Sequence, residues 1–163
     1  MENFPERDFY RVEKLNHQQK ETLQNDSEWE EDMTNAFGKG RGKKAYVRTK
    51  GVISAKHQRF VQEIKDFLED EYDIDAYESR KKADVEFNNS DGKKIGIEIE
   101  TGSNLGDSEK LKEKMKRNNE EYEKWATVLT NYGEHKEKYS QIFGSSTEIW
   151  KRTEFEEKID GLI

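Results

Sequence analysis

The sequence contains no cysteine and three histidines among its 163 residues. Without cysteine there are no disulfides, as is usual for an intracellular protein, and with so few histidines any metal site has to rely on oxygen ligands. The chain also lacks a signal peptide and any apolar run long enough to cross a bilayer, so we expect a soluble, cytoplasmic protein. Apolar residues make up 31% of the sequence, which is enough for one domain with a modest core.

Positive charge is in short supply, since 29 Lys and Arg face 36 Asp and Glu and the net charge is −7. A uniformly acidic surface repels phosphate, which excludes a general nucleic-acid coat protein. The charge is segmented, however, because residues 33–62 contain eight bases and no acid. We expect residues 1–50 to form a polar N-terminal extension with a basic, glycine-rich hairpin or arm and no separate core of its own. Residues 51–132 then form the core, and residues 133–163 add a C-terminal strand and helix to the same domain.

The most informative segment is 82–102, KADVEFNNSDGKKIGIEIETG, which holds two runs that alternate apolar and polar residues as half-buried strands do. The Asp-Gly pair between the runs predicts a hairpin. A loop of three residues, Ser90 to Gly92, sets Val85 opposite Ile97 and leaves one face apolar. A two-residue loop mixes charged and apolar residues on both faces, so we predict the longer loop.

Carboxylates gather on the other face of this hairpin. Asp84 lies opposite Glu98, Glu86 lies opposite Gly96, and Glu100 follows at the far end. Directly opposed like charges destabilise a strand pair, so protonation, basic neighbours or a metal ion has to compensate them. Oxygen ligands select hard cations such as Mg²⁺ or Mn²⁺, and phosphodiester hydrolysis fits that chemistry. The alternative is the solvated face of an edge hairpin.

Asp84, a turn and Glu98-Ile99-Glu100 resemble the catalytic core of the PD-(D/E)XK nuclease superfamily, which includes restriction endonucleases and archaeal Holliday-junction resolvases. The run GKKIGIEIETG is similar to archaeal and viral members in which glutamate replaces the final lysine of the motif. The resemblance implies an α/β protein with a restriction endonuclease-like αβββαβ core, in which helices flank a mixed central sheet. It also implies a Mg²⁺- or Mn²⁺-dependent deoxyribonuclease. Asp84, Glu98 and the backbone carbonyl of Ile99 are then the metal ligands, and Glu100 occupies the lysine slot.

A helix capped by Ser54 is predicted upstream of the hairpin, running to about Glu71 with an apolar stripe at helical spacing. His57 lies on that stripe and Glu63 lies beside it. The resemblance makes Glu63 the candidate for an acidic residue near the metals, with His57 as a second candidate. A packed histidine and a solvated glutamate are the alternatives. Residues 72–77 form the predicted first strand, which leads into the hairpin.

A second helix is predicted downstream, from Asp107 or Ser108 to Lys124. Lys114 and Asn118 interrupt its apolar stripe, and polar side chains at core-facing positions need partners. In the family this helix often lends a basic or amide side chain to the active site, so the resemblance allows Lys114 to replace part of the missing lysine's role. The alternative is that Lys114 extends to water and Asn118 bonds the backbone.

A strand at 126–130, ending in a turn at 131–133, completes the order helix, strand, hairpin, helix, strand that the superfamily shows. Beyond it we predict a short helix at 134–143, a strand at 147–150 and a terminal helix that a capping box opens at 153–156. These last elements are peripheral additions.

The basic stretch 38–51 resembles the wing hairpin of winged-helix DNA-binding domains, a glycine-rich basic turn followed by a strand. The segment before it is too short and too polar for a helix-turn-helix, so we interpret the stretch as a phosphate-seeking arm or a lone hairpin packed on the nuclease-like core. A solvated linker is the alternative. With a second basic cluster just before Asp84, the candidate DNA-binding residues are Lys39, Arg41, Lys43, Lys44, Arg48, Arg80, Lys81 and Lys82.

Three functions stay open on the sequence alone. The first is a metal-dependent DNA endonuclease, including a structure-selective one. The second is a catalytically degenerate nuclease fold that serves as a DNA- or protein-binding scaffold in a viral or plasmid replication or transfer complex, because Glu100 in the lysine slot also occurs in inactive members. In the third, the N-terminal region binds a protein partner and sets the oligomeric state, and the resemblance allows a homodimer because such nucleases often cut two strands as symmetric dimers.

Overall fold

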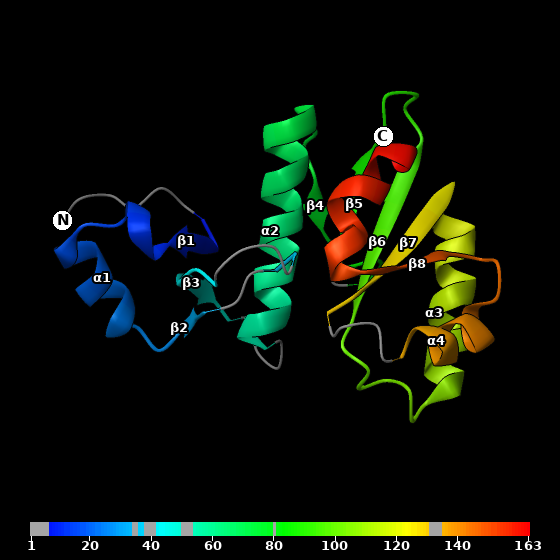
Figure 1. The fold of residues 1–163 in the computed structure, drawn as a ribbon, viewed down its shortest axis with the longest axis horizontal. Helices are drawn as coiled ribbons and strands as arrows, with labels where there is room; N and C mark the ends of the chain where they lie inside the picture. Colours follow the sequence, from blue (N-terminus) through cyan, green and yellow to red (C-terminus); the bar gives the residue numbers. More distant parts are fainter. Residues whose placement is uncertain (1–6, 34–35, 38–41, 50–53, 80, 131–134) are drawn as a thin grey trace.

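A computed structural model describes residues 7–33, 36–37, 42–49, 54–79, 81–130 and 135–163, which form an α/β protein with two sheets (Figure 1). In chain order the elements are β1 (Phe9–Arg11), η1 (Val12–Lys14), α1 (His17–Gln24), β2 (Trp29–Asp32), β3 (Ala45–Arg48), α2 (Ala55–Tyr72), β4 (Tyr77–Glu78), β5 (Val85–Asn88), β6 (Lys94–Glu100), α3 (Ser108–Glu121), β7 (Lys124–Leu129), α4 (Lys136–Phe143), β8 (Glu148–Lys151), η2 (Arg152–Glu154), α5 (Phe155–Lys158) and η3 (Ile159–Leu162). None of the helices in these ranges combines the length and apolar character that a bilayer crossing requires.

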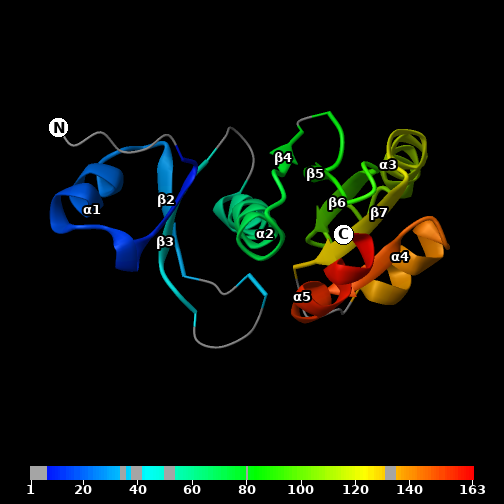
Figure 2. The ribbon, with the colours of Figure 1, turned by 90° about the horizontal axis from the view of Figure 1, so that it is seen from above.

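The larger sheet has five strands in the order β4-β5-β6-β7-β8. Strands β4, β5 and β6 pair antiparallel, whereas β6, β7 and β8 pair parallel, so the sheet is mixed as predicted. Helices flank it on both faces: α2 and α5 cover one face, and α3 and α4 cover the other (Figure 2). The order α2, β4, β5, β6, α3, β7 along the chain is the predicted succession of helix, strand, hairpin, helix and strand.

The β5–β6 hairpin has the register that the alternation of its residues predicts. Val85 pairs with Ile97, and Glu86 pairs with Gly96. The three-residue loop ends at Gly92, whose φ of 73° lies in the left-handed region that favours glycine. The apolar face is buried and packs against Phe60, Ile64 and Leu68 of α2, which places the polar face toward α3 and α4.

Gly96 allows α3 to approach that polar face closely. A Cβ at this position would lie 2.7 Å from a ring carbon of Tyr122, the residue at which α3 ends. The Tyr122 hydroxyl accepts a hydrogen bond from the Ala83 N–H (3.1 Å) and donates one to Glu86 (2.8 Å). The ring and the hydroxyl therefore fix the chain just before Asp84 against the middle of β6.

The N-terminal region forms a second, antiparallel sheet in the order β1-β3-β2, which packs beside α2 on the side away from the larger sheet (Figures 1 and 2). Strand β3 follows the basic stretch, as the wing-like pattern predicts, and residues 38–41 of that stretch lie outside the described residues. The extension also buries small apolar clusters, one of which contains Leu23, Trp29 and Tyr46. The sequence did not indicate them, because strands far apart in the chain bring these scattered aromatic residues together.

Several element ends differ from the predictions. Helix α2 continues through Tyr72 and ends at Asp73, so the strand predicted at 72–77 is reduced to the short β4. Helix α3 ends three residues earlier than expected, and β7 begins at Lys124 because its residues pair with β6. At the C-terminus, Glu154 accepts the Lys151 N–H at 2.7 Å, and a capping box at 153–156 is not formed. The predicted turn at 131–133 lies outside the described residues.

Candidate functional site

A group of charged and amide side chains lies on the polar face of the hairpin, where the first turn of α2, the start of β5, the end of β6 and the helix α3 meet. Asp84 immediately precedes β5, and Glu98 and Glu100 alternate with buried isoleucines along β6. We call this group the acid–cation cluster; it consists of His57, Asp84, Glu98, Glu100, Lys114, Arg117 and Asn118.

The Asp84 carboxylate has a donor at each oxygen. The N–H of Ile99 donates to Oδ2 at 2.7 Å, and Nε2 of His57 lies 3.3 Å from Oδ1. Burial disfavours the charged form, but the hydrogen bond and charge of His57 and the Ile99 N–H outweigh it and lower the pKa of Asp84. Burial likewise opposes protonation of His57, and Asp84 outweighs it, so the pKa of His57 is raised. Asp84 is thus an oriented, ionised carboxylate.

Glu98 is almost fully enclosed, with 1% of its surface exposed. Its Oε1 accepts hydrogen bonds from Arg117 (2.8 Å) and Asn118 (2.9 Å), and its Oε2 lies 3.3 Å from Nζ of Lys114. Burial raises the pKa of Glu98 to about 7, with the charge of Asp84 acting in the same direction and Lys114 acting against it. The two carboxylates therefore sense each other's charge, as the hairpin register predicts.

Glu100 is equally buried, and its partners differ from those of Glu98. It contacts the Lys114 ammonium through Oε1, while Oε2 accepts from the Tyr139 hydroxyl (3.0 Å) and from Nδ2 of Asn104 (3.3 Å). Burial lowers the pKa of Lys114, but the charges of Glu98 and Glu100 outweigh it and raise the pKa, so the ammonium stays charged. With both oxygens engaged, Glu100 anchors Lys114.

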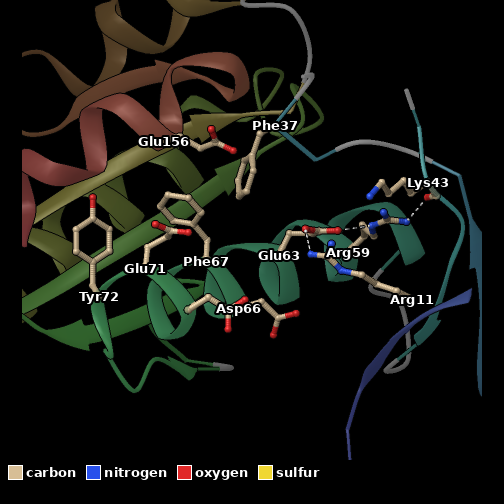
Figure 3. Close-up of a pocket in the computed structure, with 11 residues that line it drawn as sticks. Arg11, Phe37, Lys43, Arg59, Glu63, Asp66, Phe67, Glu71, Tyr72 and Glu156 are labelled. Atoms are coloured by element: carbon tan, nitrogen blue, oxygen red, sulfur yellow. Dashed lines mark hydrogen bonds and ion pairs between the residues drawn. The ribbon is translucent and has the colours of Figure 1, made fainter. Parts of the chain in front are cut away.

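Two predicted site residues lie elsewhere. Glu63 points away from the large sheet and forms ion pairs with Arg11 (3.2 Å) and Arg59 (3.1 Å), as Figure 3 shows. Six helical positions separate it from His57, which places the two side chains on different faces of α2. Glu86 is bound by the Tyr122 hydroxyl and stays outside the cluster.

A cavity of about 670 Å³ lies between α2, the N-terminal region and α5. Figure 3 shows the side chains that line this cavity. Basic residues line one part of it and carboxylates such as Asp66 and Glu156 line another. Burial and the nearby Glu63 raise the pKa of Asp66. None of the residues of the acid–cation cluster lines this cavity, so the large hollow and the candidate chemistry are separate features of the molecule.

Four of the predicted DNA-binding residues form ion pairs with acidic side chains of the same chain. Lys39, Arg41 and Arg80 lie outside the described residues, and Lys81 is exposed. The ion pairs are Lys43 with Glu13 (3.7 Å), Lys44 with Glu31 (3.1 Å), Arg48 with Asp8 (3.3 Å) and Lys82 with Glu121 (2.5 Å). These acids weaken the local attraction for phosphate relative to what the sequence segment alone suggests.

The donor atoms suit a hard divalent cation. Within the ranges that the structure describes, no three or more His, Cys, Asp or Glu side chains are arranged to hold a metal ion. Mg²⁺ and Mn²⁺ commonly take only one or two carboxylates and complete their shells with water and substrate oxygens, so two side chains of the type of Asp84 and Glu98 are enough for such an ion. Each oxygen of these two carboxylates already has a protein donor, however, and an ion has to compete with those donors.

Three residues of the site were not singled out from the sequence: Arg117 within the cluster, and Asn104 and Tyr139 beside it. Arg117 lies three residues after Lys114, a spacing that puts both on one helical face, so this signal was present. Tyr139 belongs to α4, which the sequence assigned to a peripheral addition. No local pattern predicts its contact with Glu100, because the two residues are far apart in the chain.

The raised pKa of Glu98 predicts a pH dependence of stability in the metal-free protein. Glu98 has a pKa of about 7 in the folded protein and an ordinary value of 4.5, so the folded protein binds the proton more tightly. Its protonation therefore stabilises the fold fully below pH 4.5, and this stabilisation is lost as the pH rises through about 7. The corresponding free energy is about 3 kcal/mol. We expect Glu98→Gln to lose less unfolding free energy than the wild type between about pH 5 and pH 8.

Urea unfolding in EDTA at several pH values measures this difference. His57 is present in both proteins, and the lowered pKa of Asp84 acts at more acidic pH, so neither accounts for a difference in this range. Exposed Glu109, replaced by glutamine, is the control and should follow the wild type. Parallel pH profiles for Glu98→Gln and the wild type would contradict the prediction.

Comparison of the chain with known protein families, with curated proteins and with solved structures found no match. The likeness to the nuclease superfamily therefore stays a prediction from residues 82–102 and the elements around them. The structure is that of an α/β protein whose mixed sheet lies between helices.

Proposed function

We propose that the acid–cation cluster is the active site of a Mg²⁺- or Mn²⁺-dependent DNA endonuclease with a restriction endonuclease-like core. The observation that carries the proposal is that the Lys114 ammonium of α3 lies 3.3 Å from Glu98, while Asp84, just before β5, accepts the N–H of Ile99, the residue next to Glu98. The succession of α2, β4, β5, β6, α3 and β7 and the mixed sheet support it.

The chain's own residues take distinct roles in this proposal. Asp84, Glu98 and the carbonyl oxygen of Ile99 would hold the ion, which when bound polarises the scissile phosphate and lowers the pKa of an attacking water. His57 and the Ile99 N–H orient Asp84 and keep it ionised. Lys114 supplies a fixed positive charge toward the phosphate as negative charge develops there.

The arrangement explains how a chain with glutamate in the lysine slot retains an ammonium. Glu100 does not replace the lysine chemically, because a carboxylate has the wrong charge to stabilise a phosphorane-like transition state. It instead draws Lys114 from α3 toward Glu98, and Tyr139 and Asn104 fix Glu100 in turn. The positive charge is therefore supplied by α3 and not by β6, and it lies beside Glu98.

A cleavage assay tests the proposal. Supercoiled, single-stranded, flapped and four-way-junction DNA are incubated with the protein in Mn²⁺ and, in parallel, in EDTA. We expect cleavage of at least one substrate in Mn²⁺ and none in EDTA. If none of these substrates is cut in Mn²⁺, the proposal is wrong. The pattern of substrates cut identifies the preferred DNA structure, which phosphate-binding bases do not specify.

Exchanging the charges of Glu100 and Lys114 in a double variant is expected to restore part of the DNA cleavage that Lys114→Glu alone removes. Lys114→Glu adds a carboxylate beside Glu98 and should lower cleavage about 10²-fold or more, the usual effect of losing one electrostatic contact to a transition state. The double variant Glu100→Lys/Lys114→Glu returns an ammonium to the same place from β6. We expect it to recover at least about tenfold over Lys114→Glu in initial cleavage rates. A double variant no more active than the single one would show that Lys114 acts otherwise.

A second candidate function is favoured by the carboxylate oxygens of the cluster, which already contact cationic side chains of the protein. Asp84, Glu98 and Glu100 are met by Lys114, Arg117 and His57, so the cluster is close to internal charge balance without an ion. Such a network suits a degenerate nuclease fold that serves as a DNA- or protein-binding scaffold. Calorimetric titration with Mn²⁺ distinguishes the two, because neither heat nor thermal stabilisation is expected for the scaffold.

A further inference from the structure

Arg117 occupies an oxygen that a bound cation would need. Its Nη2 donates to Oε1 of Glu98 at 2.8 Å, and Asn118 donates to the same oxygen at 2.9 Å. The guanidinium also donates from Nε and Nη2 to Oδ1 of Asn118, each at 3.2 Å. The Arg117 guanidinium therefore covers Oε1 of Glu98, and its hydrogen bonds to Asn118 hold it in place there.

Arg117 and Lys114 differ in how firmly they are held. The Lys114 side chain is 16% exposed and lies between two buried carboxylates, whereas 38% of the Arg117 side chain is exposed and its carboxylate partner is Glu98. Leaving Glu98 costs Arg117 little burial, because its outer part already contacts solvent. Lys114 would leave two buried carboxylates behind, which is far more costly.

We infer that Arg117 is a cation-dependent switch in the site, an inference that rests on the proposed function. Without a divalent ion, Arg117 neutralises Glu98. When an ion binds Asp84 and Glu98, Arg117 is repelled and loses its acceptor, and the freed guanidinium turns to a phosphate of the DNA, for which its planar fork is well suited. Cation binding and DNA binding are then coupled, and the coupling is reciprocal.

Mn²⁺ affinity of the full-length protein, measured by calorimetry without DNA, tests the first half of the switch. Arg117→Ala removes the competitor and the repulsion, so we expect the Kd for Mn²⁺ to fall about three- to tenfold, as for loss of one charge-assisted hydrogen bond at a partly exposed site. Arg117→Lys keeps the charge and loses the fork, and should lie between. Lys116→Ala removes the same charge from the exposed neighbouring position and should stay near the wild type.

DNA affinity tests the second half. Fluorescence anisotropy of a labelled DNA duplex is measured in EDTA and in Ca²⁺, which is used here so that the DNA is not consumed. The wild type should gain affinity on addition of Ca²⁺, and Arg117→Ala should gain about three- to tenfold less. Circular dichroism and thermal unfolding of the variants establish that the fold is retained.

The outcomes separate the inference from the proposed function. Tighter Mn²⁺ binding together with a smaller gain in DNA affinity for Arg117→Ala supports the switch. If the wild type binds Mn²⁺ and Arg117→Ala binds it equally or more weakly, the switch is wrong and the metal-dependent site stands. If the wild type binds no Mn²⁺, both are overturned.

Discussion

Asp84→Asn and Glu98→Gln are each expected to lower Mn²⁺-dependent DNA cleavage by at least about 10³-fold, because in the proposed active site each removes one of the two carboxylates that would hold the ion against the phosphate. Both changes keep the shape of the side chain and one of its two acceptor oxygens. Neither residue offers positive charge to DNA, so affinity for DNA in EDTA should not fall by more than a few-fold from that of the wild type. Initial cleavage rates and anisotropy titrations measure the two effects separately.

Glu86→Gln is the matched control for these variants. Glu86 lies on the same face of the same hairpin, opposite Gly96, and it is bound to Tyr122 outside the cluster. It should therefore cleave at close to the wild-type rate. Wild-type cleavage by Asp84→Asn or by Glu98→Gln would show that the cluster is not the active site. An equal loss in Glu86→Gln would point to general damage to the hairpin.

The hairpin could be predicted from the sequence because its constraints are local. Alternation of apolar and polar residues defines the two faces, and the position of Gly92 selects the loop, so a slip of one residue would expose the whole apolar face. The prediction that Lys114 and Asn118 need polar partners rests on a similarly local signal, an interrupted stripe on one helix. In the structure, Lys114 and Asn118 both contact carboxylates of β6.

The rest of the site depends on contacts that no local pattern encodes. Glu63 was chosen by analogy with a family position, and the angular position of a side chain on a helix decides whether such an analogy holds. Tyr139 reaches Glu100 across 39 positions of the chain. The N-terminal sheet is a similar case, because the aromatic rings of Tyr10 and Trp29 meet only after distant strands pair.

Arg59 joins the two parts of the molecule through a buried guanidinium. Only 2% of its surface is exposed. Nε donates to Glu63 (3.1 Å), and Nη1 donates to the carbonyls of Asp32 (3.1 Å) and Lys43 (3.0 Å) at the adjoining ends of the β2–β3 connection. The guanidinium also lies 5.4 Å from the ring centroid of Phe9. One side chain of α2 thus satisfies acceptors from several N-terminal segments.

Arg59→Met is expected to lower the free energy of unfolding by about 3–5 kcal/mol, the range for removing one partner of a buried ion pair. Methionine fills similar space, so the loss comes from leaving Glu63 with Arg11 as its remaining cation and the carbonyls of Asp32 and Lys43 without the guanidinium donor. Urea unfolding measures it. Lys65→Met is the control: Lys65 lies on the same helix, 3.9 Å from Glu78 in a partly exposed ion pair, and its removal should cost less than about 1 kcal/mol. If the two variants lose equal stability, Arg59 does not hold the N-terminal sheet on α2. If only Arg59→Met is destabilised and its N-terminal region is also cleaved first by protease, then the Arg59 side chain docks that sheet on α2.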